Sequence, residues 1–136
     1  MLSHITIACR DFADARAFYE PVMEALGLQV LFLNEDVPFI AFSNAARDRP
    51  WLFVSQPELG ASPSPGNGQM AALNAPDRES VDAAFEAAML KGGQSEGAPG
   101  LRPHYHDDFY AAYVRDPDGN KLCFVCHEPV YALEPA

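Results

Sequence analysis

Residues 11–27 read DFADARAFYEPVMEALG, and residues 77–93 read DRESVDAAFEAAMLKGG. Each segment opens with an aspartate, which is favoured before the first turn of a helix because its carboxylate accepts backbone hydrogen bonds. Each closes with a glycine, which is favoured after the last turn. Apolar residues recur at helical spacing between these ends. The two segments predict two helices, the first bent or split at Pro21, whose ring displaces one backbone hydrogen bond.

The two segments are also related by a shift of 66 positions. Any two amphipathic helices share periodicity and end signals, but that resemblance does not fix the identity of residues. Here one shift superposes five identical pairs, namely Asp11 with Asp77, Ala17 with Ala83, Glu20 with Glu86, Met23 with Met89 and Gly27 with Gly93. We infer that the chain contains an internal duplication.

Short apolar or alternating runs surround the first predicted helix. SHITIAC (3–9) precedes it, and LQVLFL (28–33), VPFIAF (37–42) and WLFVSQ (51–56) follow it, separated by polar turn material. These runs predict strands. The order in the first half is therefore strand, helix, strand, strand, strand.

The second half repeats this order after a segment rich in Pro, Gly and Ser. QMAALNA (69–75) predicts a strand, and residues 94–108 predict an irregular stretch that holds a weak second strand. FYAAYVR (109–115) and KLCFVCH (121–127) predict a hairpin joined by the turn sequence DPDGN. We therefore expect one domain over 1–136, with a first module at about 1–57, a joint at about 58–67 and a second module at about 68–128.

Composition narrows the class of protein. The formal net charge is -10 and no basic run is present, which argues against nucleic acid or an anionic membrane as a partner. No apolar run is long enough to cross a membrane, and the first residues lack the pattern of a signal peptide. The three cysteines suit reduced thiols. We expect a cytoplasmic protein.

His4, the run DFADARAFYEPVMEALGL and the closing run AAYVRDPDGNKLCFV together resemble the vicinal oxygen chelate superfamily of glyoxalases, bleomycin-resistance proteins and extradiol dioxygenases. The segment EGAPGLRPHYHDDFYAAYVRDPDGNKL (96–122) is similar to small bacterial glyoxalase-like proteins. The resemblance implies an α+β fold in which two βαβββ modules form a cupped, mixed, mostly antiparallel sheet.

The resemblance also implies where a divalent ion would bind, on the first and last strands of each module. His4 stands at the first position, and the shift of 66 places Met70 at its equivalent. Cys123 stands where a carboxylate is expected after DPDGN, and pairing WLFV with KLCF places Phe53 at the equivalent position. Met and Phe are unsuited to a hard divalent ion. We therefore expect no metal cofactor, and a divalent metal held through His4 is the alternative.

Other residues carry competing interpretations. Strand alternation directs His4 into the cup, as a pocket wall or as a ligand. Cys123 is a small wall residue or a nucleophile, and it cannot share a metal with Cys126 because residues three apart in a strand face opposite ways. The loop before the last hairpin offers a polar rim to the cup or, through its two histidines, a metal site; its residues are Arg102, His104, Tyr105 and His106.

The final hairpin raises three smaller questions. Tyr110 and Tyr113 lie on opposite faces of one strand, and we favour Tyr113 as the pocket residue. DPDGN predicts a tight turn rather than a calcium loop. Trp51 either closes the sheet edge or supports a dimer contact.

These inferences predict a glyoxalase-like protein that binds a small organic molecule without the superfamily's metal. The cup would be lined by His4, Phe53, Met70, Tyr113 and Cys123. The resemblance to bleomycin-resistance proteins implies a homodimer in which a second chain completes the cup. The alternative is a lactoylglutathione lyase-like enzyme or a dioxygenase with an atypical metal site, and a third reading is a catalytically idle structural partner.

Overall fold

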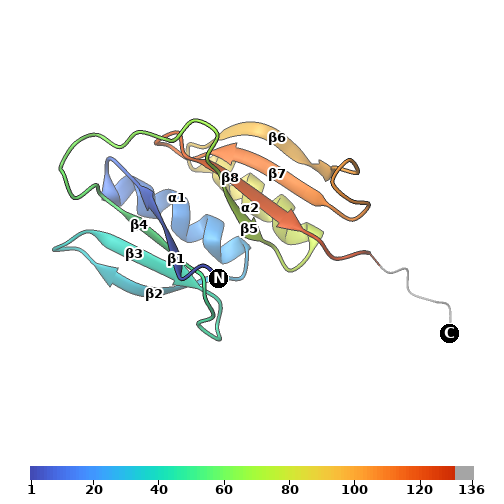
Figure 1. The fold of residues 1–136 in the computed structure, drawn as a ribbon, viewed down its shortest axis with the longest axis horizontal. Helices are drawn as coiled ribbons and strands as arrows, with labels where there is room; N and C mark the ends of the chain where they lie inside the picture. Colours follow the sequence, from blue (N-terminus) through green and yellow to red (C-terminus); the bar gives the residue numbers. More distant parts are fainter. Residues whose placement is uncertain (131–136) are drawn as a thin grey trace.

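The computed structural model describes residues 1–130 and contains two helices and two four-stranded sheets (Figure 1). The first sheet has the order β1 (His4–Ala8), β4 (Trp51–Ser55), β3 (Phe39–Ser43), β2 (Gln29–Asn34). The second sheet has the order β5 (Ala71–Asn74), β8 (Lys121–Cys126), β7 (Tyr110–Arg115), β6 (Gln94–Leu101). The helices are α1 (Phe12–Ala25) and α2 (Arg78–Leu90).

Each module has the order βαβββ, and each sheet is mixed. The first and last strands of a module pair in parallel, and the other pairs are antiparallel. The chain is therefore an α+β protein of the predicted architecture. Neither described helix is long and apolar enough to cross a membrane.

Both helices lie on one side of the sheets and share one buried core with them. The core includes Phe18 and Met23 of α1, Val81 of α2, and side chains from both sheets such as Phe42 and Phe124. In Figure 1 the sheets lie side by side, with β1 and β5 at the centre and the helices behind them. No backbone ladder joins β1 to β5 within residues 1–130. The opposite face of each sheet carries no helix, and a binding site could form there.

Strand register gives the duplication a structural basis. Thr6 pairs with Phe53, and Ala72, which is 66 positions after Thr6, pairs with Cys123. Phe53 and Cys123 are thus equivalent, as predicted from the alignment of WLFV with KLCF. The antiparallel ladders also share a bulge at the same place, between Val30 and Phe32 in the first module and between Ser95 and Gly97 in the second.

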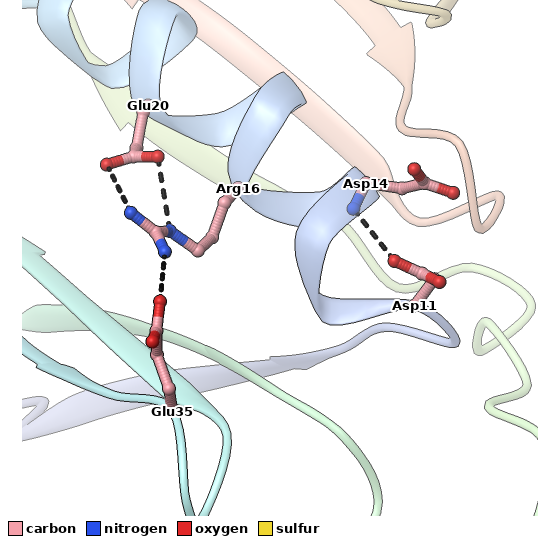
Figure 2. Close-up of polar contacts among 5 residues, drawn as sticks. All are labelled: Asp11, Asp14, Arg16, Glu20 and Glu35. Carbon is pink, nitrogen blue, oxygen red and sulfur yellow. Dashed lines mark hydrogen bonds and ion pairs between the residues drawn. The ribbon is translucent and has the colours of Figure 1, made fainter.

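The helices begin as the sequence predicts. Asp11 accepts a hydrogen bond of 2.9 Å from the backbone N–H of Asp14, and Asp77 accepts one of 2.7 Å from that of Ser80 (Figure 2 shows the first). Hydrogen bonds from the hydroxyl and backbone of Ser80 lower the pKa of Asp77. Each aspartate satisfies a backbone donor that the first helical turn leaves open.

The helix ends depart from the predicted symmetry. Gly27 has φ of 78°, but its counterpart with positive φ is Gly92, at 93°, so α2 ends one residue earlier than the shift of 66 requires. Gly93 serves another purpose, because a Cβ atom there would lie 2.8 Å from the carbonyl oxygen of Ala88. The identity of Gly27 and Gly93 is therefore not an identity of role.

Sequence analysis predicted that Pro21 would bend or split the first helix, and a split is contradicted by the structure. The helix runs from Phe12 to Ala25 without interruption. Side-chain contacts hold it in place: Val22 and Met23 are fully buried, and Arg16 forms ion pairs with Glu20 and, at 2.9 Å, with Glu35 beyond β2 (Figure 2). Tertiary packing outweighs the loss of one backbone hydrogen bond.

The irregular stretch predicted at 94–108 divides into two parts. Residues 94–101 form β6, an eight-residue edge strand with two register shifts along β7. Its composition, QSEGAPGL, hides the strand because Gly and Pro are rare in strands except at edges and bulges. Residues 102–108 form turns and are not extended.

The turn DPDGN joins the two modules around a buried carboxylate. Asp116 accepts hydrogen bonds from the backbone N–H groups of Asp118 and Asn120, from the side-chain amide of Asn120, and at 2.5 Å from the hydroxyl of Tyr19 on α1. Asn120 also donates to the carbonyl of Ala8 on β1, and Arg10 donates its backbone N–H to Asp118. Burial and the neighbouring Asp116 raise the pKa of Tyr19 well above its ordinary value.

We predict that Tyr19→Phe lowers the free energy of unfolding by about 2 kcal/mol, because it removes a buried donor from a carboxylate that remains buried. Denaturant unfolding followed by circular dichroism measures the change. Tyr110→Phe is the matched control: it removes the hydrogen bond to Asp82 at a more exposed site and should cost less. Equal losses in the two variants would contradict the account.

Candidate functional site

The helix-free side of the first sheet carries a row of aromatic side chains, here called the aromatic face and made of Phe32, Phe39, Trp51 and Phe53. Alternation along β4 places Trp51 and Phe53 on this side, while Leu52 and Val54 enter the core. Ring centroids lie 5.7 to 6.4 Å apart along the row. Within this row, sequence analysis selected only Phe53 as a lining residue.

His4 lies beside this row at the start of β1. Its ring lies edge-on to that of Phe53, with 5.2 Å between centroids, and its Nδ1 is 2.9 Å from the hydroxyl of Ser3. The side chain is exposed. Ile5 and Ile7 pack toward the core on the opposite side, as strand alternation predicts.

Tyr113 and Cys123 occupy the matching side of the second sheet, where they lie directly opposite each other on β7 and β8. Cys123 is only 1% exposed and packs with Ala111 and Val125, and Tyr113 and Phe109 pack against this cluster. Tyr110 points the other way and donates a 2.6 Å hydrogen bond to Asp82 of α2, which raises the pKa of Tyr110 to about 12. The predicted opposite orientation of the two tyrosines is confirmed, and the role of Tyr113 in a pocket stays a prediction.

Two cations flank the ring of Tyr113. The guanidinium carbon of Arg102 lies 5.6 Å from the ring centroid, and Nζ of Lys121 lies 5.7 Å from it. Arg102 also donates a 2.8 Å hydrogen bond to the carbonyl of Ala98. Gly97 permits this approach, because a Cβ atom there would lie 3.2 Å from Arg102 and 3.3 Å from Tyr113. Lys121 was missed, although alternation places it on the same side as Cys123.

The loop after β6 does not bring its two histidines together. His104 packs against Tyr105, with 4.2 Å between ring centroids, and Tyr105 packs in turn against Phe109. His106 instead approaches His127, with 2.8 Å between Nε2 and Nδ1. The predicted two-histidine arrangement assumed an extended segment, and the turns at 102–108 remove it. His127 was not among the predicted residues.

Met70 lies just before β5 and is 45% exposed. It lines a cleft of about 340 Å³ along the seam between the modules, together with Thr6 and Ala8 of β1 and with Asn120 and Lys121. The five residues predicted to line one cup thus fall into three groups: His4 with Phe53, Tyr113 with Cys123, and Met70 at the seam. Whether they bind one molecule stays a prediction.

A family model decides the assignment of the chain. The model of the glyoxalase/bleomycin resistance protein/dioxygenase superfamily matches residues 1–124. The chain belongs to this superfamily. A search of curated protein sequences finds no significant match.

Solved structures of the superfamily share this fold. A glyoxalase/bleomycin resistance protein from Albidiferax ferrireducens T118 superposes with a TM-score of 0.82 at 28% identity, over 92% of this chain and 98% of that one. A superfamily enzyme from Burkholderia phytofirmans PsJN gives 0.69 at 22% identity, over 93% and 98%. A glyoxalase-related enzyme from Fulvimarina pelagi gives 0.67 at 22%, over 93% and 87%. The last two show the fold alone.

The donor set of this superfamily member does not fit the ion that metal-binding members hold. The symmetry-related positions carry His4, Met70, Phe53 and Cys123, which offer one imidazole, one buried thiol, a thioether and no carboxylate. Hard divalent ions need several oxygen or nitrogen donors. Among residues 1–130, no three His, Cys, Asp or Glu side chains gather in a way that would hold a metal ion.

Burial also changes the chemistry of the cysteines in the described part of the chain. Burial raises the pKa of Cys123, and the nearby Tyr113, Arg102 and Lys121 only partly offset this effect. Burial and the carboxylates of Asp118 and Asp116 raise the pKa of Cys9 to about 11. A raised thiol pKa leaves less thiolate at neutral pH, so neither cysteine is prepared to act as a nucleophile.

We predict that iodoacetamide at a pH of about 8 leaves Cys9 and Cys123 unlabelled in the native protein during a period that labels all three cysteines in concentrated guanidinium chloride. A thiol of pKa about 11 is roughly one part in a thousand thiolate at that pH. Mass spectrometry of peptides measures the labelling. Rapid labelling of Cys123 alone in the native protein would instead support a nucleophilic role.

Proposed function

We propose that this superfamily member binds a small organic molecule on the helix-free side of its two modules and does so without the metal ion of its metal-dependent relatives. The observation that carries the proposal is the strand register, which makes Phe53 and Cys123 equivalent and leaves His4 as the only nitrogen or oxygen donor at the four symmetry-related positions. The chain therefore has the fold of the superfamily but lacks the set of donor atoms that its metal-dependent members use.

The character of the helix-free side supports ligand binding. The aromatic face offers flat apolar surface, and Phe39, Trp51 and Phe53 are each partly exposed. Polar groups are few and stand at defined places, with His4 beside Phe53 and with Arg102 and Lys121 beside Tyr113. An apolar surface with a few polar groups is typical of small-molecule sites.

The alternative proposal is a metal-dependent lyase or dioxygenase that uses His4, Cys123 and a histidine of the loop. Cys123 is buried, with Tyr113 packed against its cluster, and His106 is engaged with His127 through its Nε2. A site that uses His106 would require both to move, and a site that uses His104 would require Cys123 to move. The donor arrangement therefore favours the metal-free proposal.

Metal analysis of protein purified without chelator, followed by thermal shifts with Ni, Mn, Fe and Zn salts, tests this proposal. We expect no stoichiometric metal, and stabilisation by each ion that is no larger for the unaltered protein than for His4→Ala. His104→Ala shows whether a histidine of the loop takes part, because it removes an exposed loop histidine. A stoichiometric metal that is lost in His4→Ala would contradict the proposal, whether or not His104→Ala also loses it.

We also propose that two chains associate, with a second copy completing the site. The edge strand β2 exposes neighbouring apolar side chains, with Val30, Phe32 and Leu33 between 41% and 42% exposed. Exposed apolar edge strands favour pairing with another chain.

The buried, free cysteines are consistent with the proposed cytoplasmic location, where thiols stay reduced.

Light scattering coupled to size-exclusion chromatography measures this association. We predict a mass near twice that of the 14.8 kDa chain at micromolar concentration. Phe32→Glu should shift the protein toward the monomer, because it places a charge on the apolar edge strand. Leu90→Glu, at an exposed apolar residue at the end of α2, is the control and should not shift it. A monomeric unaltered protein would contradict the proposal.

A further inference from the structure

The positive charges of this acidic chain are distributed unevenly. All nine Lys and Arg residues lie in the described part, where three of them form ion pairs: Arg16, Arg78 and Arg115. Six have no carboxylate within 4 Å among residues 1–130: Arg10, Arg47, Arg49, Lys91, Arg102 and Lys121. Although the chain has a net charge of -10, six of its nine cations thus have no carboxylate partner among the described residues, and their positions are informative.

Four of the six unpaired cations lie over aromatic rings of the helix-free side. Arg47 lies 5.5 Å from the centroid of Phe32, and Arg49 lies 3.5 Å from that of Trp51. Arg102 and Lys121 lie 5.6 and 5.7 Å from the centroid of Tyr113. Each module therefore presents aromatic rings together with two cations. The contrast is Arg16, which is held between two glutamates (Figure 2).

The cations beside Tyr113 retain most of their hydrogen-bonding capacity. A guanidinium group has five N–H donors, and among the described residues Arg102 uses one of them, toward Ala98. Lys121 donates no hydrogen bond to a described side chain or carbonyl. Both side chains are half-buried, so an anion beside either of them would be less screened than one at the open surface.

We propose that the small molecule is an aromatic anion, with its charged group held by Arg102 and Lys121 beside Tyr113 and its ring packed on the aromatic side chains of the helix-free side. This inference rests on the proposed function. A carboxylate supplies the acceptors that an arginine fork recognises, and aromatic rings gain from packing at centroid distances of 4.5 to 7 Å. A neutral ligand of the same shape would leave both cations without a counter-charge.

Three pairs of probes test the charge requirement: benzoate, 2-naphthoate and indole-3-acetate, each compared with its primary amide. Titration into ¹⁵N-labelled protein, followed by NMR, gives the Kd and locates the site through the indole N–H of Trp51 and the amides of β8. We expect at least one acid to bind about tenfold more tightly than its amide, which corresponds to one charge-assisted hydrogen bond. The difference should shrink as salt concentration rises.

Variants assign the charge to its residues. Arg102→Gln and Lys121→Gln should each reduce the preference for acid over amide, by up to about tenfold, whereas the affinity for the amide should hardly change. Lys91→Gln is the matched control, because Lys91 is also unpaired but lies at the end of α2 on the helix side. Thermal unfolding of each variant checks that it folds. Two independent variants keep the test valid if one fails to fold.

The outcomes separate the two proposals. If acids and amides bind the helix-free side equally, or if Lys91→Gln has the same effect as the other two variants, the aromatic-anion inference is wrong and the proposed function stands. If no probe of either charge perturbs residues on the helix-free side, the inference and the proposed function both fail. An acid preference lost in Arg102→Gln and Lys121→Gln supports both.

Discussion

The buried carboxylate of Asp116 is the constraint on which the arrangement of the modules depends. A carboxyl group that is 3% exposed is tolerated only when its oxygen atoms are satisfied, and Asp116 accepts four hydrogen bonds, including one from Tyr19 on the other module. In the same turn, Asp118 accepts a hydrogen bond from the backbone N–H of Arg10, and Asn120 donates one to the carbonyl of Ala8. The turn that opens β8 is thereby fixed to the end of β1, and the helix-free sides of the two sheets acquire a defined relation.

The two modules have the same backbone scaffold and differ in the side chains on their helix-free sides. Caps, bulges and strand register repeat, and the positions facing the core remain apolar, as with Leu52 and its equivalent Leu122. On the helix-free side Phe53 corresponds to Cys123 and Trp51 to Lys121. Both modules place two cations beside aromatic rings, but the first module carries a row of four rings, whereas in the second both cations lie by the single ring of Tyr113. This difference, rather than the family's metal, is the basis of the function we propose.

Much of the fold followed from sequence because its signals are local. The aspartate caps, the strand alternation and the turn DPDGN each have a short-range physical cause, and together they predicted both modules and the opposite orientations of Tyr110 and Tyr113. The failures were non-local. Packing of Val22 and Met23 keeps α1 continuous through Pro21, pairing with β7 makes a strand of QSEGAPGL, and His106 meets a histidine 21 positions away. No local sequence pattern contains these contacts. No local pattern shows that four cations lie on the helix-free side either.

A crystal structure of the protein grown with nickel and manganese salts, with anomalous data collected above and below each absorption edge, tests the central claim most directly. The account predicts no anomalous peak within bonding distance of His4 Nε2, and electron density for an organic molecule on the helix-free side with its charged group near Arg102 and Lys121. An ion bonded to His4 and to a second protein ligand would contradict it.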